Sequence, residues 1–367
     1  MIGGGVFGLA AALELARRGN AVTVIDRFGS GHPATSSTGA SRSIRIAYTE
    51  PLYVELARRA IERWGQLEEQ SGIRILHLTG QVDIGPAPAL EALVAAAEAT
   101  GSGLERCSNR RLREVLPELA SSAGDGLFHR EAGTVLAEAG LQALGRAAAD
   151  AGVKVLAPER VTEVEAGDRV RVTTAARTLE ADRAVIAAGP WSGALLDSLG
   201  MSLPLAPAVG QVTFLDAPSM VDRPGVVTWP EPGSAGIYSH PVPGVGYKIA
   251  FDAGSEGWDP DVEGWEPDAD EERRLLEWME RRLPGAPRSV AYSQRHPWTM
   301  TPDSDWVIDR RGAVVLACGC SGHAFKFGPA LGPLVADVVE GTDPEPLFRL
   351  GRPGLQRSVS AADAIAR

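Results

Sequence analysis

The sequence predicts a mixed α/β (α+β) fold in which a parallel sheet covered by helices is joined to a second, mostly antiparallel sheet. Three observations support this. The N-terminal segment runs from a glycine cluster into an Ala/Leu-rich helical stretch and then into a β-branched strand, Ala21 to Asp26. Farther along, ADRAVIAAG is typical of a buried parallel strand that enters a glycine turn at Gly189. From about Met201 to Trp298, prolines and glycines separate short alternating segments, which favours antiparallel strands.

The order of these segments predicts two interwoven domains. Residues 1–75, 135–200 and 300–367 would form one discontinuous domain, and residues 76–134 and 201–299 the other. Apolar residues at helical spacing predict helices at about 52–71, 87–100, 109–116, 137–152, 270–282 and 328–340. The segments VKVL, RVTEVEA, RVRVTTA, GQVTFLDA, AGIYSH, GYKIAFDA, WVIDRR and AVVLACGC are predicted strands.

Composition excludes several classes of function. The chain has 44% hydrophobic residues and a formal net charge of -11, from 36 Lys and Arg against 47 Asp and Glu, so its overall field does not attract nucleic acid or anionic lipid. The three cysteines, Cys107, Cys318 and Cys320, form neither an even disulfide set nor a metal-type cluster, which indicates no metal site and a reducing compartment. No secretion signal and no membrane-spanning apolar run occur, so we expect a cytoplasmic protein.

Three glycines near the N-terminus indicate a dinucleotide site. Gly3, Gly5 and Gly8 form G-x-G-x-x-G, where missing side chains let the backbone turn tightly and approach a pyrophosphate at a helix N-terminus. Asp26 ends the following strand, where its carboxylate can accept hydrogen bonds from a ribose. The alternative is an ordinary glycine turn. Because only Met1 and Ile2 precede the glycines, either the first strand is very short or the start of the chain is truncated or mis-assigned.

Two longer stretches carry a resemblance to a known family. They are TSSTGASRSIRIAY, residues 35–48, and GCSGHAFKFGPALG, residues 319–332, and AAGPWS, GYKIAF and WVID add to them. The chain resembles the monomeric sarcosine oxidase and N-methyl-amino-acid oxidase family, within the D-amino-acid-oxidase-like flavoproteins, over nearly its whole length. The resemblance implies a Rossmann-like FAD-binding domain with a second, mostly antiparallel-sheet substrate domain.

The resemblance also implies which residues bind FAD. The expected cofactor-binding residues are Gly3, Gly5, Val6, Phe7, Gly8, Asp26, Arg27, Ser41, Arg42, Val161, Ala188, Gly189, Trp191, His296, Gly319, Ser321, Gly322, His323, Ala324, Phe325 and Lys326. The glycines of residues 319–328 would let the chain pass close to the isoalloxazine ring, where backbone N–H groups can stabilise negative charge. We assign no proton-transfer role to His323.

Four cations are similar to functional residues of the family. Arg45 and Lys326 match the pair that grips the substrate carboxylate, and their alternative is a role as ordinary surface cations. Arg42 matches an arginine near the flavin face, or it is a solvent-exposed loop charge. Lys248 matches the lysine that activates oxygen by stabilising forming superoxide, and its alternative is snorkelling to the surface. Arg42 and Lys248 are thus the candidate catalytic residues, with Tyr238 as a further substrate contact.

At three positions the chain departs from the family. His296 stands where the monomeric oxidases have the cysteine that bonds to flavin, so we predict FAD bound non-covalently, with a histidyl link through His296 as the alternative. Asp252 replaces a histidine; it could pair with Lys248, contact a basic or hydroxylated part of the substrate, or be a solvated strand-end residue. Trp298 replaces a tyrosine and either walls the substrate site or fills the core.

The resulting functional prediction is an FAD-dependent amino-acid oxidase. It would oxidise the C–N bond of an amino acid, favoured as a cyclic or N-methylated one bulkier than sarcosine, by hydride transfer to flavin, and O2 would accept the electrons to give H2O2 beside the imine. Alternatives are an amine dehydrogenase or subunit of a larger amine-oxidising complex with another acceptor, and a non-catalytic flavin-binding module. A nicotinamide-linked enzyme explains less of the sequence. We expect a small-molecule substrate, neither nucleic-acid nor membrane partners, and a monomer or small homo-oligomer.

Overall fold

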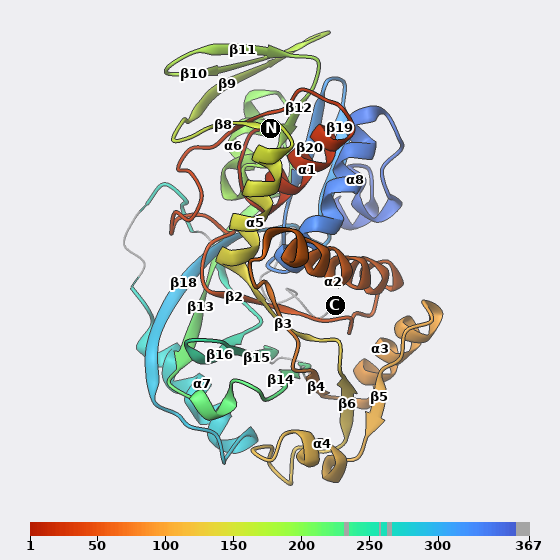
Figure 1. Ribbon diagram of the computed structural model, residues 1–367, viewed down its shortest axis with the longest axis vertical. Helices are drawn as coiled ribbons and strands as arrows, with labels where there is room; N and C mark the ends of the chain where they lie inside the picture. Colours follow the sequence, from red (N-terminus) through yellow and green to blue (C-terminus); the bar gives the residue numbers. More distant parts are fainter. Residues whose placement is uncertain (231–234, 257, 263–265, 357–367) are drawn as a thin grey trace.

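The computed structural model describes residues 1–230, 235–256, 258–262 and 266–356. Its helices are α1 Val6–Arg17, α2 Pro51–Ser71, α3 Ala87–Ala99, α4 Asn109–Val115, α5 Ala137–Asp150, α6 Ser192–Ser198, α7 Ala269–Arg282 and α8 Gly328–Glu340. The six helices that apolar spacing predicted are all present, with bounds that differ by two residues or fewer. Mixed helix and sheet elements confirm the predicted fold class (Figure 1).

A mostly parallel sheet forms one end of the molecule. Its strands are β1 Thr23–Ile25, β8 Lys154–Leu156, β12 Ala184–Ile186, β19 Val307–Arg311 and β20 Val314–Cys318. Ile2 forms parallel bridges to Ile25 on one side and Ile186 on the other, so it joins β1 to β12 across the centre of the sheet. The first strand is therefore very short in this structure. The buried strand expected before Gly189 is β12, which pairs in parallel with β20.

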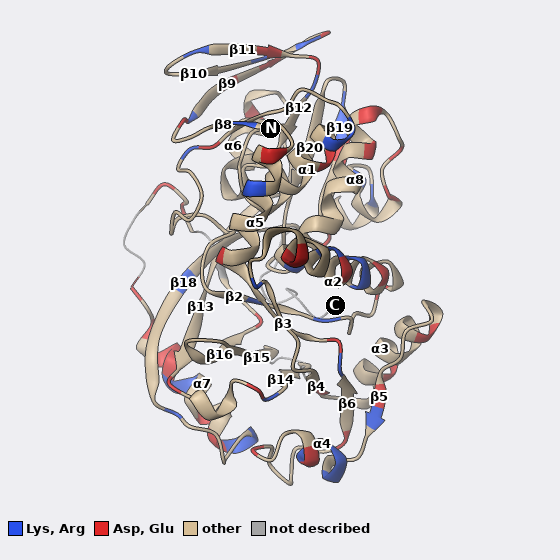
Figure 2. Cartoon of the chain, in the orientation of Figure 1, with Lys and Arg blue, Asp and Glu red and all other residues tan. Residues whose placement is uncertain are grey.

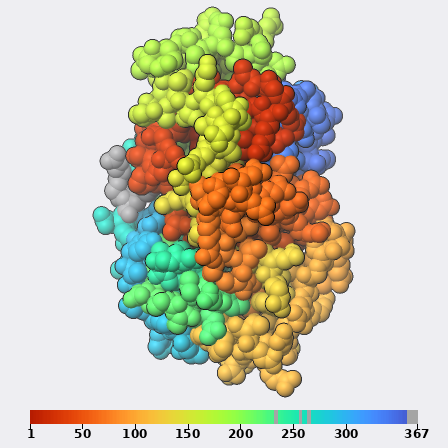
Figure 3. Space-filling model, viewed as in Figure 1, coloured from red at the N-terminus to blue at the C-terminus, as the bar shows by residue number. Residues whose placement is uncertain are grey.

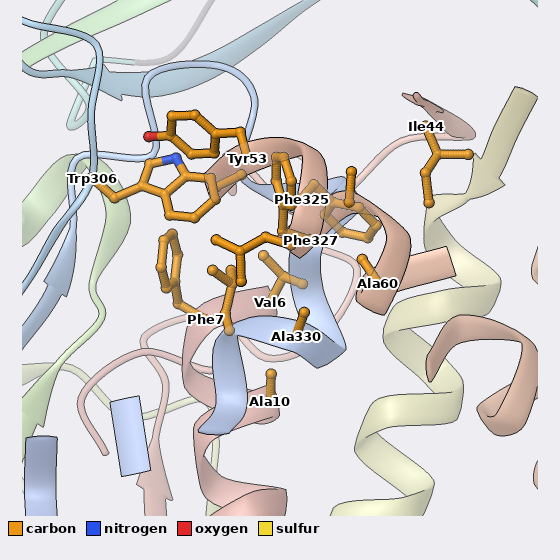
Figure 4. Packing of buried hydrophobic residues seen from close by; sticks show 14 of the residues in the cluster. Val6, Phe7, Ala10, Ile44, Tyr53, Ala60, Trp306, Phe325, Phe327 and Ala330 are labelled. Carbon is orange, nitrogen blue, oxygen red and sulfur yellow. The ribbon is translucent and has the colours of Figure 1, made fainter. Parts of the chain in front are cut away.

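Helices pack on this sheet through apolar faces. Helix α1 lies against α8 and α5, and α2 packs on α8 (Figure 1). Figure 4 shows Val6 and Phe7 of α1 close to Phe327, Trp306 and Ala330, which belong to the C-terminal third of the chain. Burial of these large side chains together places the start of α1 next to residues 319–328. The glycine motif and the 319–328 segment, which both carry sequence signals, are therefore neighbours in the fold.

A large, mostly antiparallel sheet forms the other end. Its order is β17-β13-β16-β15-β14-β4-β6-β5, with β18 paired to β13. The strands are β4 Gln81–Ile84, β5 Glu105–Cys107, β6 Gly126–His129, β13 Ala206–Leu215, β14 Gly225–Thr228, β15 Ile237–Val242, β16 Gly246–Phe251, β17 Ser255–Glu256 and β18 Val290–Met300. Helices α4 and α7 contribute to a second core on this sheet. The assignment of residues 76–134 and 201–299 to one domain, and of the rest to the other, stays a prediction.

Two small sheets complete the fold. Strands β9 Val161–Ala166, β10 Val170–Thr174 and β11 Thr178–Ala181 form an antiparallel ribbon at one tip. Strands β2 Ser41–Ile44, β3 Leu76–His77 and β7 Gly133–Leu136 form the second. In Figure 3 the red N-terminal segment borders both the yellow-green segment that contains β9–β11 and the blue C-terminal segment. β2 carries Arg42 and leads to Arg45.

Charged residues stand on several helices, whereas the three cysteines are buried or partly buried. Figure 2 shows acidic and basic residues along α2, α4 and α7. Cys107 and Cys318 are buried and Cys320 is partly buried, and all three are free thiols. Within the described ranges, no helix is long and apolar enough to span a membrane, and no cluster of His, Cys, Asp or Glu is suited to a metal ion.

Candidate active site

Two adjoining cavities bring most of the predicted site residues together. The large cavity, of about 420 Å³, extends from the N-terminal glycine turn past Asp26 to Lys248 and Phe325. The small cavity, of about 80 Å³, contains Arg45 and Lys326 in its wall. The two share Arg42, Val212, Tyr238, Lys248, Trp298, Gly322 and Phe325. A molecule in the large cavity can therefore touch one in the small cavity.

Most of the predicted cofactor residues line the large cavity. They are Gly3, Gly5, Val6, Phe7, Asp26, Arg27, Arg42, Val161, Ala188, Gly189, Trp191, His296, Gly319, Gly322, Ala324 and Phe325. His323 and Lys326 line only the small cavity. Gly8, Ser41 and Ser321 line neither cavity.

The glycine turn is compact enough for a dinucleotide to approach its backbone. Gly3 has φ +107°, and a Cβ there would lie 2.3 Å from the Ala187 carbonyl oxygen. A Cβ on Gly8 would lie 1.9 Å from the Gly3 carbonyl oxygen, so Gly8 allows helix α1 to pack on the strand. The Val6 N–H donates to Ser37 Oγ at 3.0 Å. Gly5, Val6 and Phe7, at the start of helix α1, line the large cavity.

Asp26 closes this end of the large cavity. Its Oδ2 accepts the Gly4 N–H at 2.7 Å, and its Oδ1 accepts the N–H groups of Phe28 and Gly29. The carboxylate is thus fixed beside the glycine turn, where it faces the cavity as a ribose acceptor must. The buried hydroxyl of Ser36 lines the same cavity and has no hydrogen-bond partner in the described part of the chain. This cradle and its open polar atom fit the adenosine and pyrophosphate parts of FAD.

An ion pair links the two sheets at the large cavity. The Arg27 guanidinium lies 4.8 Å from the Phe28 ring centroid and 5.2 Å from that of Trp191. Asp261 pairs with Arg27 and accepts the Trp191 Nε1–H at 3.0 Å. Hydrogen bonds from Arg27 and Trp191 hold the pKa of Asp261 below its ordinary value. Asp261 lies in the segment after β17 of the large sheet, so its contact with Arg27 brings that segment to the wall of the large cavity.

Arg42 is anchored by backbone carbonyls. Its guanidinium donates to the carbonyl oxygens of Ser36, Thr38 and Ser41 and lies 5.4 Å from the Phe325 ring centroid. Burial lowers the pKa of this arginine. The cation is therefore held rigidly where the two cavities meet, and its alternative interpretation as a freely solvated loop charge is wrong.

Lys248 is buried at the same junction. Only 2% of it is exposed, and its Nζ donates to the Ser41 carbonyl oxygen at 3.2 Å. The aromatic rings of Phe214 and Tyr238 lie 5.8 and 5.7 Å from Nζ. Burial, followed by the charge of Arg42, holds the pKa of Lys248 well below its ordinary value. Lys248 does not snorkel to the surface.

His296 presents an imidazole to the large cavity. Its Nε2 contacts Gln294 Nε2, and its buried Nδ1 has no hydrogen-bond partner among the described residues. Burial, with added effects of Arg42 and Lys248, holds the pKa of His296 well below its usual range, so the ring is neutral. A Cβ on Gly39 would lie 2.5 Å from the ring, so this glycine makes room for it.

Arg45 and Lys326 form an anion site in the small cavity. Arg45 donates to the Ala47 carbonyl oxygen and lies between the rings of Tyr48 and Trp229. Lys326 Nζ donates to Tyr48 Oη at 2.9 Å. Arg45 is 5% and Lys326 8% exposed, and neither forms an ion pair with a carboxylate in the described part of the chain. Two buried basic side chains that form no direct ion pair favour a bound anion, and they are not surface charges.

Among the described residues that line the small cavity, Asp252 supplies the one carboxylate. Burial raises its pKa to about 6, although Arg45 and Lys326 act in the opposite direction. Asp252 makes no ion pair with Lys248 within the described ranges, so the pairing considered from the sequence is absent. Asp252 thus lines the same cavity as the two cations that we expect to bind an anion, and their charges act on it.

Trp298 and Tyr238 wall both cavities. A Cβ on Gly210 would lie 2.3 Å from the Trp298 ring and one on Gly254 2.4 Å, so the indole is wedged between two glycines. Its Nε1–H donates to Met300 Sδ at 2.9 Å. Trp298 is therefore a fixed wall of the cavities.

His323 lies in the small cavity wall within an aromatic cluster. Its Nε2 is 3.0 Å from the Ser304 carbonyl oxygen, and its ring packs against Tyr53 and Trp306. These contacts hold the His323 ring in place within the aromatic cluster. Figure 4 shows Tyr53, Trp306 and Phe327 of the same cluster.

Several cavity residues were not predicted from the sequence. Those lining the large cavity include Gly4, Ser36, Ser37, Glu159, Thr162, Asp261 and Cys320, and those lining the small cavity include Ser43, Gln211 and Val227. Ser36 and Ser37 stand in the stretch that carries the family resemblance, so that signal could have included them. Asp261 and Gln211 stand in no motif, and only the folded chain brings them to the site.

Comparisons with known proteins agree on one family. The model of the FAD dependent oxidoreductase family matches residues 1–338. Monomeric sarcosine oxidase of Streptomyces avermitilis is 31% identical over 95% of this chain and 94% of that enzyme. N-methyl-L-tryptophan oxidase of Yersinia pestis is 26% identical over 92% of this chain and 93% of that enzyme. Among solved structures, NikD, an unusual amino acid oxidase, has a TM-score of 0.81 at 23% identity, covering 93% of each chain, which shows a shared fold.

Proposed function

Because the chain belongs to the family of FAD-dependent oxidoreductases, we propose that it oxidises the C–N bond of an amino acid whose carboxylate is held by Arg45 and Lys326. The observation that carries this proposal is the pair of buried cations in a small cavity that shares a wall with a dinucleotide-type cavity. The substrate class follows from the relatives, which are named for sarcosine and N-methyl-L-tryptophan. A cyclic or N-methylated amino acid is therefore the favoured substrate.

FAD would be held by the residues of the large cavity. The glycine turn and Asp26 suit its pyrophosphate and ribose, and the end shared with the small cavity is where its reacting part must lie to reach a substrate. When bound, FAD accepts the two electrons and hydrogen of the substrate and passes the electrons to O2. The chain supplies orientation and electric field around that chemistry.

Each cavity residue then has a distinct proposed role. Arg45 and Lys326 bind and orient the carboxylate, which places the α-carbon toward the shared wall. Trp298 and Tyr238 exclude water. Lys248, buried at the junction, supplies positive charge where O2 takes up electrons. Arg42 contributes a second fixed positive charge at the same junction.

The proposed partners are small molecules. They are the amino acid and O2, and we propose a monomer or small homo-oligomer in the cytoplasm. Three free cysteines support a reducing compartment.

Anaerobic mixing of the FAD-loaded protein with a panel of N-methylated, cyclic and primary amino acids tests the function. We expect the flavin absorbance to bleach with a secondary amino acid, and to return on admission of air with formation of H2O2. Bleaching without peroxide would instead indicate a dehydrogenase or a subunit of a larger complex. A flavin that no amino acid bleaches would indicate a binding module and refute the proposal.

FAD is expected to be released by acid. His296 occupies the position of the family's flavin-linking cysteine, and no sulfur is available there. After precipitation with trichloroacetic acid, the flavin should be in the supernatant. A yellow, washed pellet would contradict this prediction. If the colour of that pellet were lost in His296→Ala and kept in Cys320→Ser, the link would be histidyl.

A further inference from the structure

Asp252 stands among positive charges that the proposed substrate would neutralise. It lines the small cavity with Arg45 and Lys326, and these two cations are the charges that act on it most. Burial is the main reason that the pKa values of Tyr48 and Tyr238 are raised, and the negative charge of Asp252 raises both further. Arg42 and Lys248 line the shared wall, and His323 lies in the small cavity with its Nε2 at the Ser304 carbonyl oxygen.

We propose that Asp252 accepts the proton that the ammonium group of the substrate loses before its C–N bond is oxidised. This inference rests on the proposed function. An N–H bond of the ammonium breaks, an O–H bond forms on the Asp252 carboxylate, and the electron pair stays on nitrogen. The products are a neutral amine and a neutral carboxyl group, and no further reactant is needed. Only the neutral amine carries the lone pair that must assist loss of hydrogen from the α-carbon.

Binding of the substrate carboxylate makes Asp252 more basic. In the free protein, Arg45 and Lys326 lower the pKa of Asp252 against the effect of burial, and the balance is a pKa of about 6. A carboxylate bound to those cations cancels part of their field and adds a negative charge, so the pKa of Asp252 rises. Asp252 is thus mainly ionised at neutral pH when the cavity is empty, and it gains proton affinity when a carboxylate occupies the two cations.

Other groups near the small cavity are less suited to this role. Lys326 donates to Tyr48 and is needed as a cation for the carboxylate, and Lys248 donates to the Ser41 carbonyl oxygen. The carboxylates Asp26, Glu159 and Asp261 line the large cavity and not the small one. Asp252 is therefore the acceptor that the geometry favours.

Proton uptake on ligand binding tests the coupling without any turnover. Methoxyacetate replaces the amine nitrogen of sarcosine by oxygen, so it brings a carboxylate and no proton. When it binds the FAD-loaded wild type at neutral pH, we expect uptake of between about half a proton and one proton per site, read by an indicator dye in weak buffer. Asp252→Asn should bind methoxyacetate with no uptake, and the exposed control Asp343→Asn should behave as wild type. Binding to the wild type without uptake would overturn the proposal.

Anaerobic flavin reduction by the amino acid tests the proton transfer itself. At neutral pH, Asp252→Asn should reduce its flavin at least about 10-fold more slowly than wild type, as expected for loss of a general base. The rate should recover as the pH approaches the ammonium pKa of the substrate, and Asp252→Glu should regain part of it. An unchanged pH profile in Asp252→Asn would overturn the inference while leaving the oxidase function intact. If no amino acid bleaches the flavin, the proposed function fails, and methoxyacetate still decides the coupling.

Discussion

Replacing Lys248 by methionine is expected to slow reoxidation of the reduced enzyme by O2 by roughly 10²–10³-fold, while anaerobic reduction by substrate changes far less. The reason is the position of the charge. Lys248 is 2% exposed at the wall shared by both cavities, and a fixed charge that is shielded from solvent acts strongly on charge that develops as O2 is reduced. Methionine keeps the length and apolar packing of the side chain and removes the charge.

Stopped-flow spectroscopy separates the two half-reactions. One mixing experiment follows flavin bleaching by substrate without oxygen, and the other follows return of the absorbance when reduced enzyme meets O2. Lys154→Met is the matched control, because Lys154 is exposed on β8 and lines neither cavity. Equal slowing of reduction and reoxidation would contradict the assignment, since it would indicate general damage to the site.

The reoxidation rate should also fall as the pH rises. Burial and the charge of Arg42 hold the pKa of Lys248 well below that of an exposed lysine, so its cation is lost at a lower pH than usual. The positively charged form is the active one in this role, and the rate should therefore decline through that lowered pKa. Lys248→Met should show no such decline.

Local signals predicted the fold where they were strong. Apolar residues recur at helical spacing along α2 and α8, and the buried β-branched run of β12 precedes a glycine turn. These signals lie within each element, so the local sequence is enough to predict it. The strands β4 and β6 were not predicted. They have four residues each, and β4 pairs in parallel with β14, far away in the sequence. Such pairing is determined by tertiary contacts that no local window contains.

The residues of the candidate site also fall into two groups, those that a sequence motif predicts and those that only the tertiary structure brings to the site. Residues within motifs, such as Arg45 and Lys326, are brought into one cavity although they lie far apart in the chain. Asp261 has no motif, and its contact with Arg27 exists only because the segment after β17 reaches the other sheet. For Asp252, position on the strand left three roles open, and burial beside Arg45 and Lys326 is what favours one of them. The sequence shows which residues carry a charge, whereas the burial of that charge and its neighbours are known only from the folded structure.

Removing the charge of Arg45 is expected to raise KM for the amino acid by roughly 100-fold, which is typical of losing one partner of a buried charge pair. Arg45→Met keeps apolar packing between Tyr48 and Trp229, and Arg45→Lys should restore part of the binding. Lys326→Met should have a similar effect. The exposed Arg146→Met serves as the control. Steady-state kinetics with FAD-loaded protein measure these changes.

An amine that lacks the carboxylate distinguishes anion binding from structural damage. The wild type should use such an amine poorly, and Arg45→Met should use it about as well as the wild type does, because the lost contact was made only to the carboxylate. In the double variant Arg45→Met/Lys326→Met, the loss of binding free energy for the amino acid should be smaller than the sum of the losses in the two single variants. The reason is that both cations bind the same anion in one small cavity. Full additivity, or an equal loss with the decarboxylated amine, would show that the two cations do not share a substrate carboxylate. The small cavity would then need another ligand to account for two buried basic side chains that form no direct ion pair in the described part of the chain.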